Sequence, residues 1–228
     1  MKKIRLIALP LIFALLFPIR RAWPLSGDDS KSVIEDFSHD KVGEFPSVFR
    51  TYPFQRHKAV KVYSVQDEGG NRFLHASAAG DTQDLAVQIF DRFAWDISRF
   101  PKISWRWRAK SIPLPPPGSG EHFDDNACGV YVVFGGWGGK ALKYTWSGDR
   151  RTGEVVEDTP NRFYITVKES GPRAVGQWQT VTIDVAEEYK KFFKSNPSDP
   201  TGFGLLTDGD GTHSPSVCDY DDFTIEGP

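Results

Sequence analysis

The sequence predicts an all-β protein, built as an antiparallel β-sandwich. Apolar and polar residues alternate with period two in many short segments, and Gly, Pro, Asn and Asp residues separate these segments as turns. Phe, Trp and Tyr make up 14% of the chain, which suits strands that bury large side chains between two sheets. About eleven segments are predicted as strands: 33–37, 60–65, 72–78, 85–90, 103–109, 128–135, 140–147, 163–168, 177–184, 202–207 and 217–225.

The clearest strand is the segment 103–109, around which the other elements are arranged. Ile103, Trp105 and Trp107 alternate with Ser104 and two arginines. Successive side chains of a strand point to opposite faces of its sheet. We therefore expect the apolar residues in the core, and Arg106 and Arg108 on the face that is open to polar partners.

One short helix is predicted near 185–195. Asp184 is a suitable N-cap, and Glu187 stands at the N3 position of a capping box. Val185 and Tyr189 lie one helical turn apart on a single apolar face, and Pro197 prevents the helix from continuing. A single helix beside many strands leaves the class all-β.

Residues 1–26 are predicted to lie outside the fold. Lys2, Lys3 and Arg5 precede the apolar run 6–17, which has the length of a secretory h-region and is short for a membrane span. A cleaved signal peptide, an uncleaved N-terminal anchor and a segment without a targeting role are all compatible with this pattern. We favour export, with residues 27–228 as a single β-sandwich domain in the periplasm or outside the cell, and with no membrane span after removal of the signal.

The charge of the exported part disfavours nucleic acid as a partner. The whole chain has 28 basic and 30 acidic residues, a formal charge of −2. Removing 1–26 takes away five basic residues and leaves 23 against 30, a charge of −7. An acidic protein has no electrostatic attraction to phosphate backbones.

The chain contains two cysteines, Cys128 and Cys218, each at the start of a predicted strand. In an oxidising compartment they could form a disulfide that closes a long loop. The alternative is a pair of buried thiols that never meet, because the sequence does not give their separation.

The segment 208–212 (DGDGT) is a candidate metal loop. Asp208 and Asp210 in a Gly-rich turn offer closely spaced carboxylates to a hard cation such as Ca²⁺. The alternative is an ordinary turn, since Asp and Gly favour turns for local reasons. No cofactor is predicted beyond this possible structural calcium.

Asp124 and Asp125 form a second acidic pair, in the long crossing that follows the central strand. They could bind a ligand, hold a metal or serve as half of an acid/base pair. Neighbouring residues of an extended chain point in opposite directions, so one of them at most should face a given pocket. The alternative role is an ion-pair network with Arg106 or Arg108.

The aromatic residues divide into core and candidate platform positions. Trp105 and Trp107 share a face with Ile103 and are expected in the core, while Tyr144 and Trp146 share a face that could be either. Trp137 lies within GGWGG, without a periodic pattern to bury it, and is the best candidate for an exposed ring. Exposed Trp and Tyr rings serve as flat apolar surfaces for sugar rings.

The order of these motifs resembles a bacterial family known as domain of unknown function 3047. The resemblance covers about residues 33–226 and implies a jelly-roll β-sandwich similar to those of the carbohydrate-binding type, in a protein exported by Gram-negative bacteria. It implies no reaction. The residues that carry it are Trp105 to Arg108, Asp124, Asp125, Trp146, Trp178, Asp184, and the loop from Thr207 to Asp210.

We therefore expect an exported jelly-roll sandwich that binds a carbohydrate or a similar polyhydroxylated ligand without catalysis. No nucleophile elbow, HExxH, Walker or GxGxxG motif is present in a suitable context. The alternatives are a glycan hydrolase or lyase that uses Asp124 or Asp125 as acid/base, and an envelope protein that binds a protein partner. The candidate ligand contacts are Arg106, Arg108, Asp124, Asp125, Trp137, Tyr144 and Trp146.

Overall fold

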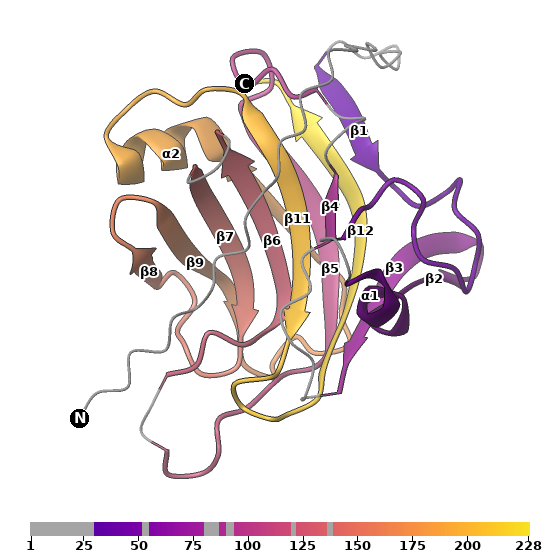
Figure 1. Cartoon of the computed structure of the whole chain (residues 1–228). Helices are drawn as coiled ribbons and strands as arrows, with labels where there is room; N and C mark the ends of the chain where they lie inside the picture. The colour runs from indigo at the N-terminus through magenta and orange to yellow at the C-terminus, as the bar shows by residue number, and fades with distance from the viewer. Residues whose placement is uncertain (1–29, 52–54, 80–86, 90–93, 120–121, 136–138) are drawn as a thin grey trace.

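The protein is a sandwich of two β-sheets packed face to face (Figure 1). The computed structural model describes residues 30–51, 55–79, 87–89, 94–119, 122–135 and 139–228. Sheet A has the strand order β10-β5-β12-β3-β2, with β1 paired to β12. Its strands are β1 (Lys31–Glu35), β2 (Tyr63–Glu68), β3 (Asn71–Ala78), β5 (Lys102–Ser111), β10 (Gln179–Asp184) and β12 (Ser216–Glu226).

Sheet B has the order β4-β11-β6-β7-β9-β8. The chain passes repeatedly from one sheet to the other, in the manner of a jelly roll. The strands of sheet B are β4 (Val87–Ile89), β6 (Asn126–Phe134), β7 (Lys140–Ser147), β8 (Val155–Thr159), β9 (Phe163–Ser170) and β11 (Pro200–Asp208).

The predicted all-β sandwich is confirmed, with two differences in detail. β7 and β9 pair in parallel, whereas every other described pair is antiparallel. The strand β8 was not predicted, because VVEDT has no clear alternation and lies at the edge of its sheet, where only β9 constrains it.

The predicted helix is α2 (Val185–Phe193). The Asp184 carboxylate accepts a hydrogen bond from the Glu187 amide at 2.8 Å, which is the N-cap interaction expected from the sequence. Lys194 ends the helix in the left-handed conformation. In the part of the chain that the structure describes, no helix is both long and apolar enough to cross a membrane.

A second helix, α1 (Arg56–Val62), replaces the first half of the strand predicted at 60–65. Its β-branched valines favour a strand, but Ala59 and Val62 pack one helical face onto the core. β2 begins only at Tyr63. Tertiary packing here outweighs local propensity.

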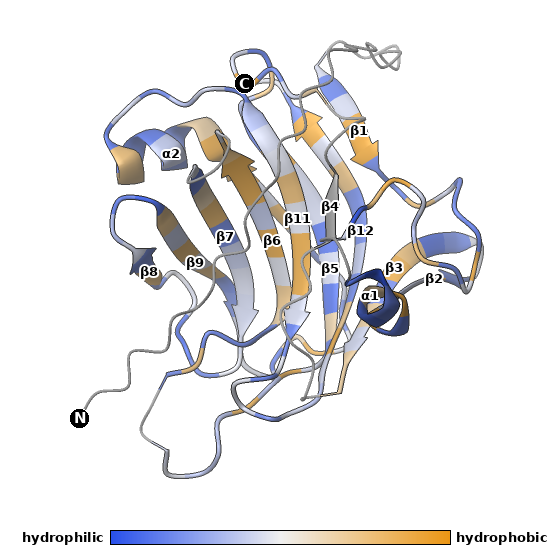
Figure 2. Cartoon of the chain, viewed as in Figure 1, coloured by the Kyte–Doolittle hydropathy of each residue, from blue (hydrophilic) through white to orange (hydrophobic). Residues whose placement is uncertain are grey.

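The core between the sheets follows the alternation of the central strand. Ile103, Trp105 and Trp107 have no exposed surface, as predicted. Figure 2 shows hydrophobic bands, in orange, along β6 and β11 of the facing sheet. Trp105 packs on Tyr144 with ring centroids 5.7 Å apart, and Trp107 packs on Trp146 at 6.2 Å. The prediction that Tyr144 and Trp146 contact a ligand at the surface is therefore wrong: both rings are 0% exposed, because β7 turns this face toward β5.

Cys128 and Cys218 are joined by a disulfide bond, with their Cα atoms 5.5 Å apart. Cys128 lies on β6 in sheet B and Cys218 lies on β12 in sheet A. The bond therefore links the two sheets through the core.

Candidate functional site

The outer face of sheet A carries a ladder of ion pairs. Arg106 and Arg108 project from β5 away from the core, and the strand register places Asp221 opposite Arg106 and Asp219 opposite Arg108 on β12. Arg106 Nη2 lies 2.7 Å from Asp221 Oδ2, and Arg108 Nη2 lies 2.8 Å from Asp219 Oδ2. The polar face predicted for the arginines is confirmed. Their partners, however, are carboxylates of β12 and not the acidic pair of the crossing loop.

Asp219 is the best connected member of the ladder. Its carboxylate is fully buried and lies 2.7 Å from His75 Nδ1, 2.9 Å from Arg108 Nε and 3.2 Å from Lys110 Nζ. Burial alone would raise the pKa of Asp219, but these hydrogen bonds and charges outweigh it and lower the pKa. The carboxylate is therefore ionised at neutral pH and holds the side chains of Arg108 and Lys110 in place.

Trp178 lies over these arginines on the outer face. The Arg108 guanidinium is 4.6 Å from the centroid of the indole and that of Arg106 is 5.0 Å from it, both within cation–π range. The edge of the ring meets Phe73, with centroids 5.6 Å apart. The indole is half-buried, so these contacts fix its orientation while part of it stays accessible.

The sequence named Trp178 as one of the residues that carry the family resemblance, but not as a candidate ligand contact. Trp178 directly precedes Gln179, which pairs with Trp107, so the register of β10 against β5 brings Trp178 beside Arg108. A pattern of apolar and polar residues does not reveal this register, because it depends on which strands are neighbours.

Asp125 fastens the crossing loop to the turn after β11. Its side chain is buried and accepts hydrogen bonds from the Gly211 amide at 3.1 Å, and from the amide and hydroxyl of Thr212 at 2.6 Å each. The carboxylate is thus held by the DGDGT turn itself. A role as a surface ligand contact, as predicted for Asp125, does not agree with this burial.

The same turn brings three carboxylates together. Asp125, Asp208 and Asp210 each offer an oxygen, and these oxygens lie within 4.8 Å of one another. Asp208 Oδ1 also accepts a hydrogen bond from the Asp210 amide at 3.2 Å, as in an ordinary Asp turn. This oxygen set suits a hard cation, and the metal role of Asp208 and Asp210 remains a prediction, to which the structure adds Asp125 as a third donor.

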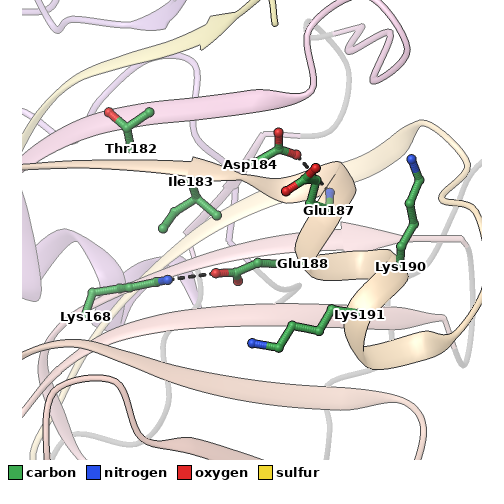
Figure 3. Close-up of a pocket in the computed structure, with 8 residues that line it drawn as sticks. All are labelled: Lys168, Thr182, Ile183, Asp184, Glu187, Glu188, Lys190 and Lys191. Atoms are coloured by element: carbon green, nitrogen blue, oxygen red, sulfur yellow. Dashed lines mark hydrogen bonds and ion pairs between the residues drawn. The ribbon is translucent and has the colours of Figure 1, made fainter.

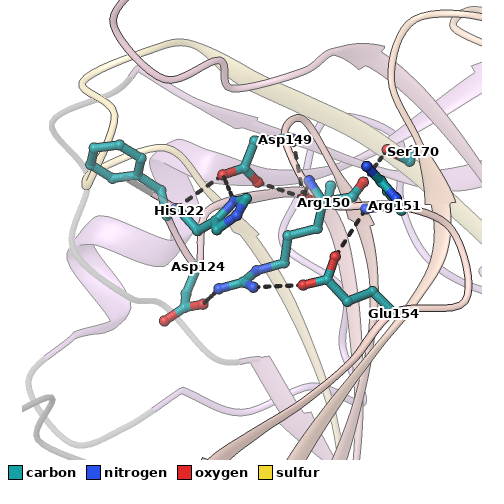
Figure 4. Close-up of polar contacts among 9 residues, drawn as sticks. His122, Asp124, Asp149, Arg150, Arg151, Glu154 and Ser170 are labelled. Atoms are coloured by element: carbon teal, nitrogen blue, oxygen red, sulfur yellow. Dashed lines mark hydrogen bonds and ion pairs between the residues drawn. The ribbon is translucent and has the colours of Figure 1, made fainter. Parts of the chain in front are cut away.

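Asp124 does not share the contacts of Asp125 and joins a separate network around Arg150 (Figure 4). The Arg150 guanidinium lies between two carboxylates, 3.2 Å from Asp124 Oδ1 and 2.9 Å from Glu154 Oε1. Asp149 holds the end of the crossing loop, because its carboxylate accepts a hydrogen bond from the Phe123 amide at 3.1 Å. These contacts give Asp124 a role in fixing the loop. Trp137 lies outside the described residues.

Sequence comparison places the chain in a family. The family described as "Protein of unknown function (DUF3047)" matches residues 47–224. The chain belongs to this family. No curated protein matches the DUF3047 chain in sequence.

Solved structures similar to this DUF3047 protein include carbohydrate-binding modules. The family 11 module of the cellulase Lic26A-Cel5E of Clostridium thermocellum has 10% identity and a TM-score of 0.44, over 87% of this chain and 95% of that one. A cellulose-specific module, CBM28, has 8% identity and a TM-score of 0.39, over 72% and 80% of the two chains. An exo-β-agarase has 12% identity and a TM-score of 0.39, over 86% of this chain and 25% of that one. Likeness at this level carries no argument about a ligand, so the proposals below rest on the residues of this chain.

Proposed function

We propose that this DUF3047 protein binds a carbohydrate or a similar polyhydroxylated ligand on the outer face of sheet A. The observation that carries the proposal is the half-buried Trp178 ring, which two guanidinium groups hold against the sheet. An aromatic ring that is fixed and partly exposed offers an apolar surface to the C–H faces of a sugar, with little conformational entropy left to lose.

The groups around the ring provide hydrogen bonds for hydroxyls. Arg106 is 31% exposed and donates, while the carboxylates of Glu68 and Asp222 are 62% and 50% exposed and accept. A few polar groups around an apolar surface give orientation and specificity in ligand sites. This division of roles matches a polyol, which both donates and accepts.

The charge of this face supports a neutral ligand. Basic and acidic side chains are nearly equal in number and lie in contact, so their fields largely cancel. A polyanion or a polycation would find no excess of opposite charge here. The basic members are Arg106, Arg108 and Lys110, and the acidic members are Glu68, Asp219, Asp221 and Asp222.

The test compares two aromatic substitutions on opposite sheets. Affinity gels and a glycan array are run with the wild type, Trp178→Ala, Trp178→Phe and Tyr131→Ala. Tyr131 is the matched control, since it is also half-buried but alternates with Val130 and Val132 onto the outer face of sheet B. We expect Trp178→Ala to lose glycan binding, Trp178→Phe to keep part of it, and Tyr131→Ala to bind as the wild type does.

Each other outcome favours a different function. Loss of binding in Tyr131→Ala alone would move the site to sheet B. Release of reducing sugar from a bound glycan would make the protein an enzyme, the alternative that assigned an acid/base role to Asp124 or Asp125. Absence of binding on every glycan would favour the protein-partner hypothesis and refute this proposal.

We also propose that the protein acts in the periplasm or outside the cell. Two features support this location: the basic and apolar composition of residues 1–26, and a disulfide between Cys128 and Cys218, a bond that persists in oxidising compartments. Fractionation of cells that express the full chain tests this. Recovery of the protein in the cytoplasm, with both thiols reduced, would contradict it.

A further inference from the structure

An open hollow of about 520 Å³ lies where α2 leaves β10 and faces β9 (Figure 3). Its inner polar groups have partners within the protein. Lys168 Nζ lies 2.8 Å from Glu188 Oε1, and the Glu188 carboxylate is also hydrogen-bonded to the Tyr144 hydroxyl. The outer face of sheet A, by contrast, presents a ring nitrogen of His75 that has no such partner among the described residues.

His75 stands beside Asp219 on the outer face of sheet A. The strand register places His75 on β3 opposite Asp219 on β12, and Asp219 opposite Arg108 on β5, so the three side chains form one row. His75 Nδ1 lies 2.7 Å from Asp219 Oδ1. Because an ionised carboxylate only accepts hydrogen bonds, Nδ1 carries the proton that joins the two.

The other ring nitrogen, Nε2, faces outward as an acceptor. In a neutral imidazole whose proton is on Nδ1, Nε2 keeps its lone pair. The His75 side chain is 19% exposed, and Nε2 is not among the buried polar atoms that lack a partner. The buried Asp219 carboxylate fixes the tautomer and the orientation of the ring. The row therefore presents one fixed acceptor at the surface.

Lys110 brings a donor to the same carboxylate. Its Nζ lies 3.2 Å from Asp219 Oδ2, the oxygen that does not bind His75, and its side chain is 40% exposed. A ligand group at this place must donate to Nε2 and can accept from Nζ. A hydroxyl does both, whereas a carboxylate or phosphate has no proton to donate and a ligand ammonium is repelled by Lys110.

His75 lies close to the Trp178 ring. The edge of the indole meets Phe73, with ring centroids 5.6 Å apart. Phe73 and His75 are two positions apart on β3, so they share its outer face with about 7 Å between them along the strand. The indole also lies over Arg108, whose partner Asp219 holds His75. The acceptor and the apolar ring surface therefore belong to one face.

We propose that His75 is a specificity-determining contact of this face: its Nε2 accepts a hydrogen bond from a hydroxyl of the glycan that stacks on Trp178. This inference rests on the proposed function. Asp219 is the positioning residue, since it keeps the proton on Nδ1 and holds the ring in place. The face thus selects ligands with a free hydroxyl beside the unit that covers Trp178.

The test uses two substitutions that separate the two sides of the ring. His75→Asn keeps a donor at the position of Nδ1, which can still bind Asp219, but has no atom at the position of Nε2. His75→Gln carries its amide at the position of Nε2, where the amide oxygen can accept. His122→Asn is the matched control, because His122 also pairs with an aspartate, 3.2 Å from Asp149, but lies on the crossing loop.

Affinity electrophoresis of the full chain measures Kd for β-glucan, xylan, galactomannan and starch. We expect the affinity for at least one of them to fall about threefold to tenfold in His75→Asn, the loss of one hydrogen bond, and to fall less in His75→Gln. His122→Asn should bind like the wild type. The thermal midpoint of His75→Asn should stay near that of the wild type. In the wild type, added glycan should shift the ¹⁵N NMR signal of His75 Nε2.

Three outcomes would overturn the inference. Loss of binding in Trp178→Ala, with unchanged affinity in His75→Asn, would remove His75 from the site and leave the proposed function standing. An NMR spectrum with the proton of His75 on Nε2, or with protons on both ring nitrogens, would remove the acceptor. A wild type that binds none of the four glycans would count against this inference and the proposed function together.

Discussion

Reduction of the Cys128–Cys218 disulfide should destabilise the protein by a predictable amount. The two residues are separated by 90 positions, so the bond closes a loop that spans much of the chain and ties sheet A to sheet B. In the chain-entropy account, a loop of about this length restricts the unfolded state by about 4.6 kcal/mol at 25 °C, and measured values are more often about 2–4 kcal/mol. For a chain of this size we expect the thermal midpoint to fall by roughly 5–15 °C.

The assay follows thermal and urea unfolding of the wild type with and without a phosphine reductant. The chain has only these two cysteines, so the reductant has a single target. The control is the double variant Cys128→Ala/Cys218→Ala, whose midpoint should be low and should not respond to the reductant. An equal midpoint in oxidised and reduced wild type, or two free thiols in protein purified from the periplasm, would refute the reasoning.

Three further predictions concern carboxylates. Burial raises the pKa of Glu35 from 4.5 to about 7, so the contribution of protonated Glu35 to stability is full below pH 4.5 and is lost as pH rises through 7. Urea unfolding should find Glu35→Gln more stable at pH 8, by at most about 3 kcal/mol, and equal near pH 4; equal stability at pH 8 would contradict this. Asp219→Asn removes the buried charge opposite Arg108 and leaves its guanidinium only the exposed Glu68, so it should cost about 3–5 kcal/mol in urea unfolding, against less than about 1 kcal/mol for the exposed Asp222→Asn. If Asp208 and Asp210 form the predicted metal site, calcium should raise the thermal midpoint of the wild type and EDTA should reverse this increase. Asp210→Asn should not respond to calcium. A wild type that does not respond to calcium would show that the loop is an ordinary turn.

The sequence alone predicted correctly those elements that show a clear local pattern, either one apolar face or a capping residue. The alternation of β5 predicted both its buried tryptophans and its outward arginines, and the Asp184 cap predicted the start of α2. The prediction failed where local preference and packing disagree. The valines of α1 favour a strand, but packing against the core keeps this segment helical.

The candidate sites depended on contacts between residues far apart in the chain. The sequence showed that Tyr144 and Trp146 share a face but not which face, and only the packing of β7 against β5 decided that they are core. The sequence also showed two acidic pairs, but only the fold revealed their partners. Asp125 binds the DGDGT turn, and Asp124 forms an ion pair with Arg150.

The sequence by itself determined the class of fold, the alternation of its central strand and the cap of its main helix, because each depends on residues within a few positions of one another. The tertiary structure decided the partners: Asp219 for Arg108, Trp178 above both arginines, and Glu188 beside Tyr144. Strand order and register set these neighbours, and they follow from how the whole core packs rather than from any single segment.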